Sequence, residues 1–114
     1  MALVTLHEAL AALAIALPMN ELRGFCWRWR IQELAVFGSV LRTDFRPDSD
    51  VDFLVTFNPQ AGISLFDMVT METELADIVG RRVDLVSRGG IERSENWIRK
   101  KAILESARTL HVAG

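Results

Sequence analysis

The chain has 114 residues, half of them hydrophobic, so it can bury one modest core and has little room for a second domain. Thirteen basic and fifteen acidic residues give a net charge of −2, and no long basic run indicates a nucleic-acid groove. We therefore expect a single domain over 1–114 and no nucleic-acid partner. The one cysteine, Cys26, excludes an internal disulfide and favours a reducing, cytoplasmic location.

Two helices are expected before the first strand. The apolar stretch 6–17 lacks a basic leader and is too short to span a bilayer, so we expect a packing helix and no membrane association. Pro18 ends it, and Asn20 is a candidate cap for a second helix that runs to about Arg28. The Trp-Arg-Trp-Arg alternation at 27–30 is compatible with stacking on bases. The favoured interpretation is tryptophans packed on the core or on a partner, beside solvated arginines.

A strand is expected at 33–37, and it runs directly into Gly38 and Ser39. Glycine at a strand-to-helix junction lets the backbone approach a ligand closely, and free N–H groups at a helix start favour an anion. The Ser39 hydroxyl could donate one more hydrogen bond to a phosphate oxygen. Taken alone, Gly-Ser is a common turn and structural cap. The pair becomes a candidate phosphate site only when a second signal accompanies it.

That second signal is a pair of carboxylates at the start of an expected strand at 51–57. Side chains two positions apart on a strand point to the same face, so Asp50 and Asp52 converge. Two close anions repel unless a cation lies between them, and hard oxygen ligands suit Mg²⁺ or Mn²⁺. The alternative is that both residues simply solvate the end of a strand, after a turn that contains Pro47.

A third acidic residue, Asp84, lies in a short β-like run at 82–86. A helix expected over 64–79 separates it from the second strand, and a strand–helix–strand unit could bring Asp84 beside Asp50 and Asp52. Three carboxylates on one sheet face can hold two divalent ions about 3.5–4 Å apart. A satisfied buried Asp84, or an acid on an edge strand, is the alternative.

Together, these three segments resemble the minimal nucleotidyltransferases of the DNA polymerase β superfamily. The residues that carry the resemblance are Ala35-Val36-Phe37-Gly38-Ser39, Asp50-Val51-Asp52-Phe53-Leu54-Val55 and Gly80-Arg81-Arg82-Val83-Asp84-Leu85-Val86. The resemblance implies an α/β (α+β) fold with a polymerase β-like core, in which a short mixed sheet is flanked by helices. It divides the single domain into N-terminal helices (1–30), a catalytic core (31–86) and a C-terminal helical segment (87–114).

The resemblance also implies roles for the matching residues. Gly38 and Ser39 would hold the β- and γ-phosphates of a nucleoside triphosphate. Asp50 and Asp52 would bind both metal ions. Asp84 would complete one metal site and face the acceptor hydroxyl. The expected cofactors are two Mg²⁺ ions, with Mn²⁺ as a substitute, and ATP is the expected substrate of an in-line attack on its α-phosphorus.

Arg42 is a further candidate for nucleotide binding through a phosphate, and a solvated helix arginine is an equal alternative. The family often has Gly directly after this arginine, whereas this chain has Thr43. That departure bears on the flexibility of the loop and on access to the triphosphate.

The acceptor site is expected to come from a partner or from a second copy of the chain. Minimal nucleotidyltransferases are commonly encoded beside a small helical HEPN ribonuclease toxin and act as its antitoxin by transferring AMP from ATP to a toxin tyrosine. The leading hypothesis is therefore adenylylation of a HEPN toxin. Two alternatives stay open: a small-molecule nucleotidyltransferase that works as a homodimer, and an antitoxin that inhibits by binding alone.

The C-terminal stretch 91–110 mixes apolar and basic residues. We expect an amphipathic helix that packs on the sheet and exposes a basic face. Alternatively, Arg99, Lys100 or Lys101 contacts the triphosphate or an acidic partner surface.

Overall fold

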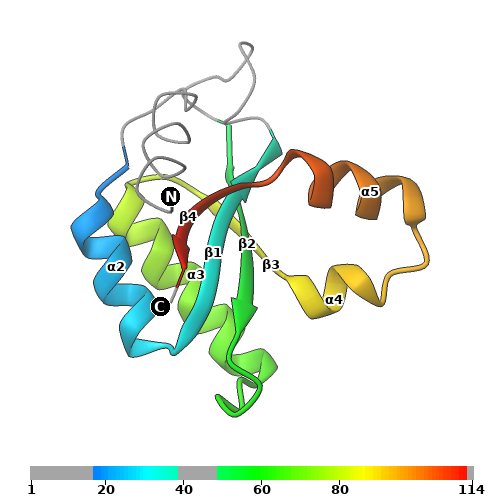
Figure 1. Cartoon of the computed structure of the whole chain (residues 1–114). Helices are drawn as coiled ribbons and strands as arrows, with labels where there is room; N and C mark the ends of the chain where they lie inside the picture. The colour runs from blue at the N-terminus through cyan, green and yellow to red at the C-terminus, as the bar shows by residue number, and fades with distance from the viewer. Residues whose placement is uncertain (1–16, 39–48, 113–114) are drawn as a thin grey trace.

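The computed structural model describes residues 17–38 and 49–112. These residues form one four-stranded sheet with helices on both faces (Figure 1). The elements in chain order are α2 (Met19–Arg28), β1 (Ile31–Phe37), β2 (Val51–Phe57), α3 (Leu65–Val79), β3 (Val83–Ser87), α4 (Arg88–Glu92), α5 (Trp97–Ser106) and β4 (Arg108–Val112).

The sheet is mixed, as expected. Its strand order is β3-β2-β1-β4. Strand β1 runs antiparallel to both β2 and β4, whereas β2 and β3 are parallel. The parallel pair requires a crossover, and α3 supplies it. The start of β2 and the start of β3 therefore lie at the same end of the sheet, where β1 ends.

The crossover helix α3 has the ends that its sequence predicts. Ser64 caps its start, because the Ser64 hydroxyl accepts a hydrogen bond from Asp67 N at 3.1 Å and the Asp67 carboxylate accepts one from Ser64 N at 2.9 Å. Gly80 ends the helix in the left-handed conformation, at φ 72°. These local signals explain why the expected helix at 64–79 is confirmed almost to the residue.

Each face of the sheet has its own core, because successive strand residues point to opposite faces. Helices α2 and α3 cover one face, and the fully buried side chains there include Phe25, Leu34, Phe53, Met71 and Leu75. Helices α4 and α5 pack on the other face, over a smaller cluster made of Ala35, Phe37, Leu54, Ile91 and Ile103.

The apolar residues of α3 are only partly buried. Leu65, Phe66 and Val69 are 84%, 86% and 67% exposed, whereas Met71 and Leu75 are fully buried. Helical spacing alone does not tell which apolar side chains face the sheet. The apolar residues on the outer side of the first turns of α3 therefore remain at the surface, whereas Met68 packs against the core.

The start of α2 also differs from the expectation. Its N-cap is Pro18, whose carbonyl oxygen accepts a hydrogen bond from Leu22 N at 3.0 Å, and Asn20 lies inside the first turn. Proline tolerates this position because its missing N–H is not needed at a helix start. The expected packing helix at 6–17 lies outside the described residues, except for Leu17, which is buried.

The C-terminal expectation of one helix over 91–110 is wrong. The stretch contains the end of α4, the helix α5, and then β4, which pairs with β1. Ala107 leaves helical geometry at φ −58° and ψ 138°, and Leu110 is buried. The exposed N–H and C=O groups along β1 require partners, and β4 provides them.

Within the described ranges, the longest helix has 15 residues, and none is long and apolar enough to cross a membrane.

Candidate active site

The three motif segments meet at one end of the sheet. Phe37, the last residue of β1, is the register partner of Asp52 on β2. Asp52 is in turn the register partner of Asp84 on the parallel strand β3. The strand–helix–strand unit therefore brings Asp84 directly beside Asp52, as the sequence predicted.

Both acidic residues lie on the sheet face that carries α4 and α5. Asp52 shares its face with Leu54, two residues along β2, and Leu54 packs with Ile91 of α4 and Ile103 of α5. The intervening Phe53 is fully buried on the opposite face. Asp52 and Asp84 are each partly exposed, so both carboxylates are accessible from solvent.

Gly38 follows β1 directly and adopts φ 75°, a conformation that L side chains rarely adopt. A Cβ built at this position would overlap Oδ2 of Asp52. Glycine is therefore required here for two reasons, its backbone conformation and its approach to the carboxylate. The end of β1 therefore lies against the start of β2, and the approach of Gly38 to a phosphate stays a prediction.

Asp50 precedes β2 and is paired with an arginine. Arg82 Nε lies 3.1 Å from Asp50 Oδ1, and the Arg82 carbonyl accepts a hydrogen bond from Val51 N at 3.0 Å. This arginine is not among the site residues predicted from the sequence. A signal for it was present in the sequence, because Arg82 directly precedes the strand that contains Asp84. In a parallel register with β2, this position places Arg82 opposite Asp50.

The donor set at this end of the sheet consists of carboxylates, which is the chemistry that Mg²⁺ or Mn²⁺ requires. Among the residues that the structure describes, no group of three or more His, Cys, Asp or Glu side chains is arranged to hold a metal ion. Asp50 is engaged with Arg82 at 3.1 Å. Asp50, Asp52 and Asp84 have the ligand type that suits a divalent metal ion, and they lie at the same end of the sheet. The convergence of all three carboxylates on such an ion stays a prediction.

Two predicted nucleotide-binding residues, Ser39 and Arg42, lie outside the described residues. The departure at Thr43 lies there as well.

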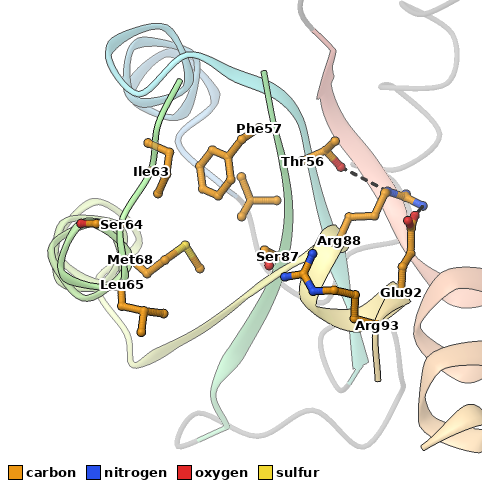
Figure 2. Close-up of a pocket in the computed structure, with 12 residues that line it drawn as sticks. Thr56, Phe57, Ile63, Ser64, Leu65, Met68, Ser87, Arg88, Glu92 and Arg93 are labelled. Atoms are coloured by element: carbon orange, nitrogen blue, oxygen red, sulfur yellow. Dashed lines mark hydrogen bonds and ion pairs between the residues drawn. The ribbon is translucent and has the colours of Figure 1, made fainter. Parts of the chain in front are cut away.

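A hollow of about 600 Å³ opens at the other end of β2 and β3 (Figure 2). Ile63, Leu65 and Met68 line one side of it, and Arg88 and Arg93 line the other. Arg88 Nε donates to Thr56 Oγ1 at 3.1 Å, which fixes this arginine on the sheet face. None of the predicted site residues lines this hollow.

Cys26 is buried in the core between α2 and the sheet. Burial raises the pKa of its thiol to about 12, because the charged thiolate is poorly solvated there. A thiol with this pKa stays protonated at neutral pH, so Cys26 is a poor nucleophile in the folded protein.

The similarity to known proteins extends over most of the chain. Residues 20–110 match the family described as nucleotidyltransferase domain. The chain belongs to the nucleotidyltransferase family. The matched range contains every predicted site residue, and the mixed sheet flanked by helices is the expected fold, so both the family and the fold class are confirmed. This nucleotidyltransferase is thus an enzyme of the class that the sequence predicted.

Two similar proteins share about a third of their residues with this nucleotidyltransferase. The protein adenylyltransferase MntA of Thermococcus cleftensis is 37% identical over 92 residues, which cover 81% of this chain and 86% of that protein. A solved minimal nucleotidyltransferase is 32% identical, with a TM-score of 0.61 over 78% of this chain and 85% of that chain.

A third similarity concerns the fold alone. A solved complex of an AMPylated HEPN toxin from Shewanella oneidensis with an MNT antitoxin contains a chain of 18% identity and a TM-score of 0.58. The match covers 83% of this nucleotidyltransferase and 70% of that chain.

Proposed function

We propose that this nucleotidyltransferase is the antitoxin of a toxin–antitoxin pair, and that it transfers AMP from ATP to a tyrosine hydroxyl of a HEPN ribonuclease toxin. The observation that carries the proposal is the approach of Gly38 to the Asp52 carboxylate, beside the register pair of Asp52 and Asp84. A relative named as a protein adenylyltransferase and a fold neighbour bound to an AMPylated toxin support AMP transfer to a protein.

The reaction forms a bond between the tyrosine oxygen and the α-phosphorus of ATP. It breaks the bond between the α-phosphorus and the oxygen that bridges the α- and β-phosphates. Pyrophosphate leaves, and the phenolic proton passes to a carboxylate or to water. Asp84 lies on β3, the outer strand of the described sheet, and is partly exposed, so it is well placed to face an incoming hydroxyl. Gly38 leaves space for the Asp52 carboxylate because it has no side chain, so the backbone at the end of β1 lies close to this carboxylate.

Asp50, Asp52 and Asp84 are the residues proposed to hold Mg²⁺. When bound, the ion would neutralise negative charge on the triphosphate. In such reactions the protein mainly positions groups and balances charge, so the roles of these side chains are to orient the nucleotide and to exclude unproductive arrangements.

A protein partner agrees with the apolar surface of the described residues. Leu65 and Phe66 on α3 are 84% and 86% exposed, and Trp97 and Ile98 on α5 are 68% and 66% exposed. Large apolar side chains that are this exposed are typical of surfaces that another protein covers.

Intact mass spectrometry on the helical protein that co-purifies with this chain tests the proposal. After incubation with ATP and Mg²⁺, the partner should gain one or more AMP units, and peptide mapping should place them on tyrosine. Asp84→Asn should abolish the gain. Asp77→Asn removes the same charge from an exposed position on α3 and should leave the gain unchanged. Circular dichroism of both variants checks that the fold is intact.

An unmodified partner in the presence of active enzyme would contradict the proposal. Full AMP transfer by Asp84→Asn would contradict the assigned role of that carboxylate. A growth assay separates catalysis from occlusion, because an antitoxin that works only by binding would still neutralise its toxin when it carries Asp50→Asn.

A further inference from the structure

A second hollow, called the groove below, is lined by residues at the end of the sheet opposite to the carboxylates. It has a volume of about 980 Å³ and lies between the end of α2, the start of β1, the end of β2 and the end of β4. Strand β1, which is seven residues long, separates the groove from Gly38. At ~3.3 Å per residue the strand spans about 23 Å. The side chains that give it its chemistry are Arg23, Trp27, Arg28, Arg30, Asn58 and His111.

The charge of this groove is entirely basic. Its lining contains three arginines and no Asp or Glu, although the chain as a whole has a net charge of −2. Arg28 is neutralised by an ion pair with Glu74. The guanidinium groups of Arg23 and Arg30 make no hydrogen bond or ion pair with any residue that the structure describes. Two arginines in one groove without acidic partners favour an anionic ligand.

The two tryptophans of the 27–30 alternation have different environments. Trp29 is partly buried against the core, and its Nε1 donates to Glu74 Oε2 at 2.8 Å. Trp27 lines the groove and is 84% exposed. Trp29 thus packs on the core, as expected, whereas for Trp27 the other expected environment, a partner surface, stays a prediction. An exposed indole beside arginines is the combination on which bases stack while their phosphates are held.

The backbone at the edge of the groove is strained. Arg30 has φ 54°, and it is the only residue other than glycine with a positive φ in the part of the chain that the structure describes. Two hydrogen bonds hold the turn: Arg30 N donates to Trp27 O, and Asn58 N donates to Arg30 O, each at 3.3 Å. Strain of this kind costs stability, and it collects at binding sites, where a side chain must be held in a set position.

His111 adds a neutral polar group to the same groove. Burial lowers its pKa, and the charge on Arg23 lowers the pKa further. The imidazole is therefore uncharged at neutral pH, so it can donate one hydrogen bond and accept another.

We propose that this groove binds a nucleoside phosphate, with Arg23 and Arg30 on the phosphate and Trp27 stacked on the base. The site is separate from the carboxylates and is independent of AMP transfer. The ligand could be a free nucleotide or one unit of a single-stranded nucleic acid, because both carry the same base and phosphate chemistry. The volume of about 980 Å³ accommodates either.

Isothermal titration calorimetry tests the proposal on the Asp52→Asn variant in EDTA, so that binding at the carboxylate site is suppressed. The probes are AMP and a short single-stranded oligoadenylate. Saturable binding is expected, and it should weaken by at least about fivefold in Arg23→Ala and in Trp27→Ala. Arg30→Gly is a sharper probe, because glycine accepts φ 54°, so the whole arginine side chain is removed without added backbone strain. It should weaken binding by a similar factor while the fold remains at least as stable.

Two matched controls come from α5. Arg99→Ala removes an exposed arginine and Trp97→Ala removes an exposed tryptophan, and neither residue lines the groove. Both should bind like the parent protein. Tighter binding of the oligoadenylate with a steep salt dependence would identify a nucleic-acid strand, and equal binding of the two probes would identify a free nucleotide. Absence of saturable binding to both probes, or equal weakening by the groove and α5 variants, would overturn the proposal.

Discussion

The Cα atom of Gly38 faces the carboxylate of Asp52 so closely that a Cβ on residue 38 would overlap Oδ2 of Asp52. The end of β1 and the start of β2 thus constrain each other. Any side chain at position 38 must either displace the carboxylate or shift the backbone that approaches it. The left-handed conformation of Gly38, φ 75°, adds a second penalty for any other residue.

Gly38→Ala should therefore reduce AMP transfer by more than about tenfold, since ~1.4 kcal/mol of lost positioning is enough for that factor. It should also lower the free energy of unfolding by about 1–2 kcal/mol because of the backbone conformation. Gly80→Ala is the matched control, because Gly80 has φ 72° but a Cβ there meets nothing within 4 Å. It should cost similar stability and leave transfer intact. Urea unfolding and a pyrophosphate-release assay measure the two effects, and equal loss of activity in both variants would refute the explanation.

Arg82→Gln should strengthen binding of Mn²⁺ by about two- to fivefold, because the guanidinium no longer competes for Asp50. The effect is small because the Arg82 and Asp50 side chains are 79% and 46% exposed and solvent screens the pair. Electron paramagnetic resonance of free Mn²⁺ measures the affinity without turnover. Arg99→Gln, an exposed arginine on α5, is the control and should bind Mn²⁺ like the wild type. Unchanged or weaker binding in Arg82→Gln would contradict the competition.

Stability should fall as pH rises above about 9, because the pKa of Cys26 is raised from 9.0 to about 12 in the folded protein. Below pH 9 the thiol is protonated in both states and contributes no pH dependence. Between pH 9 and 12 the unfolded thiol ionises while the folded one does not, which favours unfolding by up to about 1.4 kcal/mol per pH unit. Above pH 12 the dependence ends.

Urea unfolding at pH 8 to 11 measures this dependence. Other groups also titrate in that range, so the informative quantity is the difference between the wild type and Cys26→Ala, which should shrink as the pH rises. A constant difference would show that the thiol ionises equally in both states. Iodoacetamide at pH 8 should modify Cys26 only after unfolding, since the residue is 1% exposed.

Phe66→Ser should weaken capture of the proposed partner protein and change the free energy of unfolding by less than about 0.5 kcal/mol. Phe66 is 86% exposed, so its side chain contributes little to the core of the isolated chain. Leu75→Ala, at a fully buried position on the same helix, should instead cost about 2–5 kcal/mol. Co-purification and thermal denaturation separate the two effects. Normal capture by Phe66→Ser would exclude this part of α3 from the interface.

Local sequence signals predicted much of this nucleotidyltransferase. The β-branched and aromatic run gave β2 its bounds, Val51–Phe57, and the capping box at Ser64 with Gly80 at the other end bounded α3. The two-residue spacing of strand side chains and the crossover rule placed Asp84 beside Asp52. Each of these inferences depends on neighbours in the chain or on a general rule of connection.

The tertiary structure alone decided which distant residues became partners. Two examples are contacts between segments far apart in sequence: the pairing of Arg82 with Asp50 and the addition of β4 to the edge of β1. The exposure of Trp27 and the inward packing of Trp29 also depend on such contacts. Periodicity tells which residues share a face, but not whether another element covers that face. The sequence by itself therefore predicted the family, the three strands that carry the motif and the helix α3, and it singled out the candidate acidic residues. Long-range packing determined which of the side chains are neutralised, buried or left at the surface.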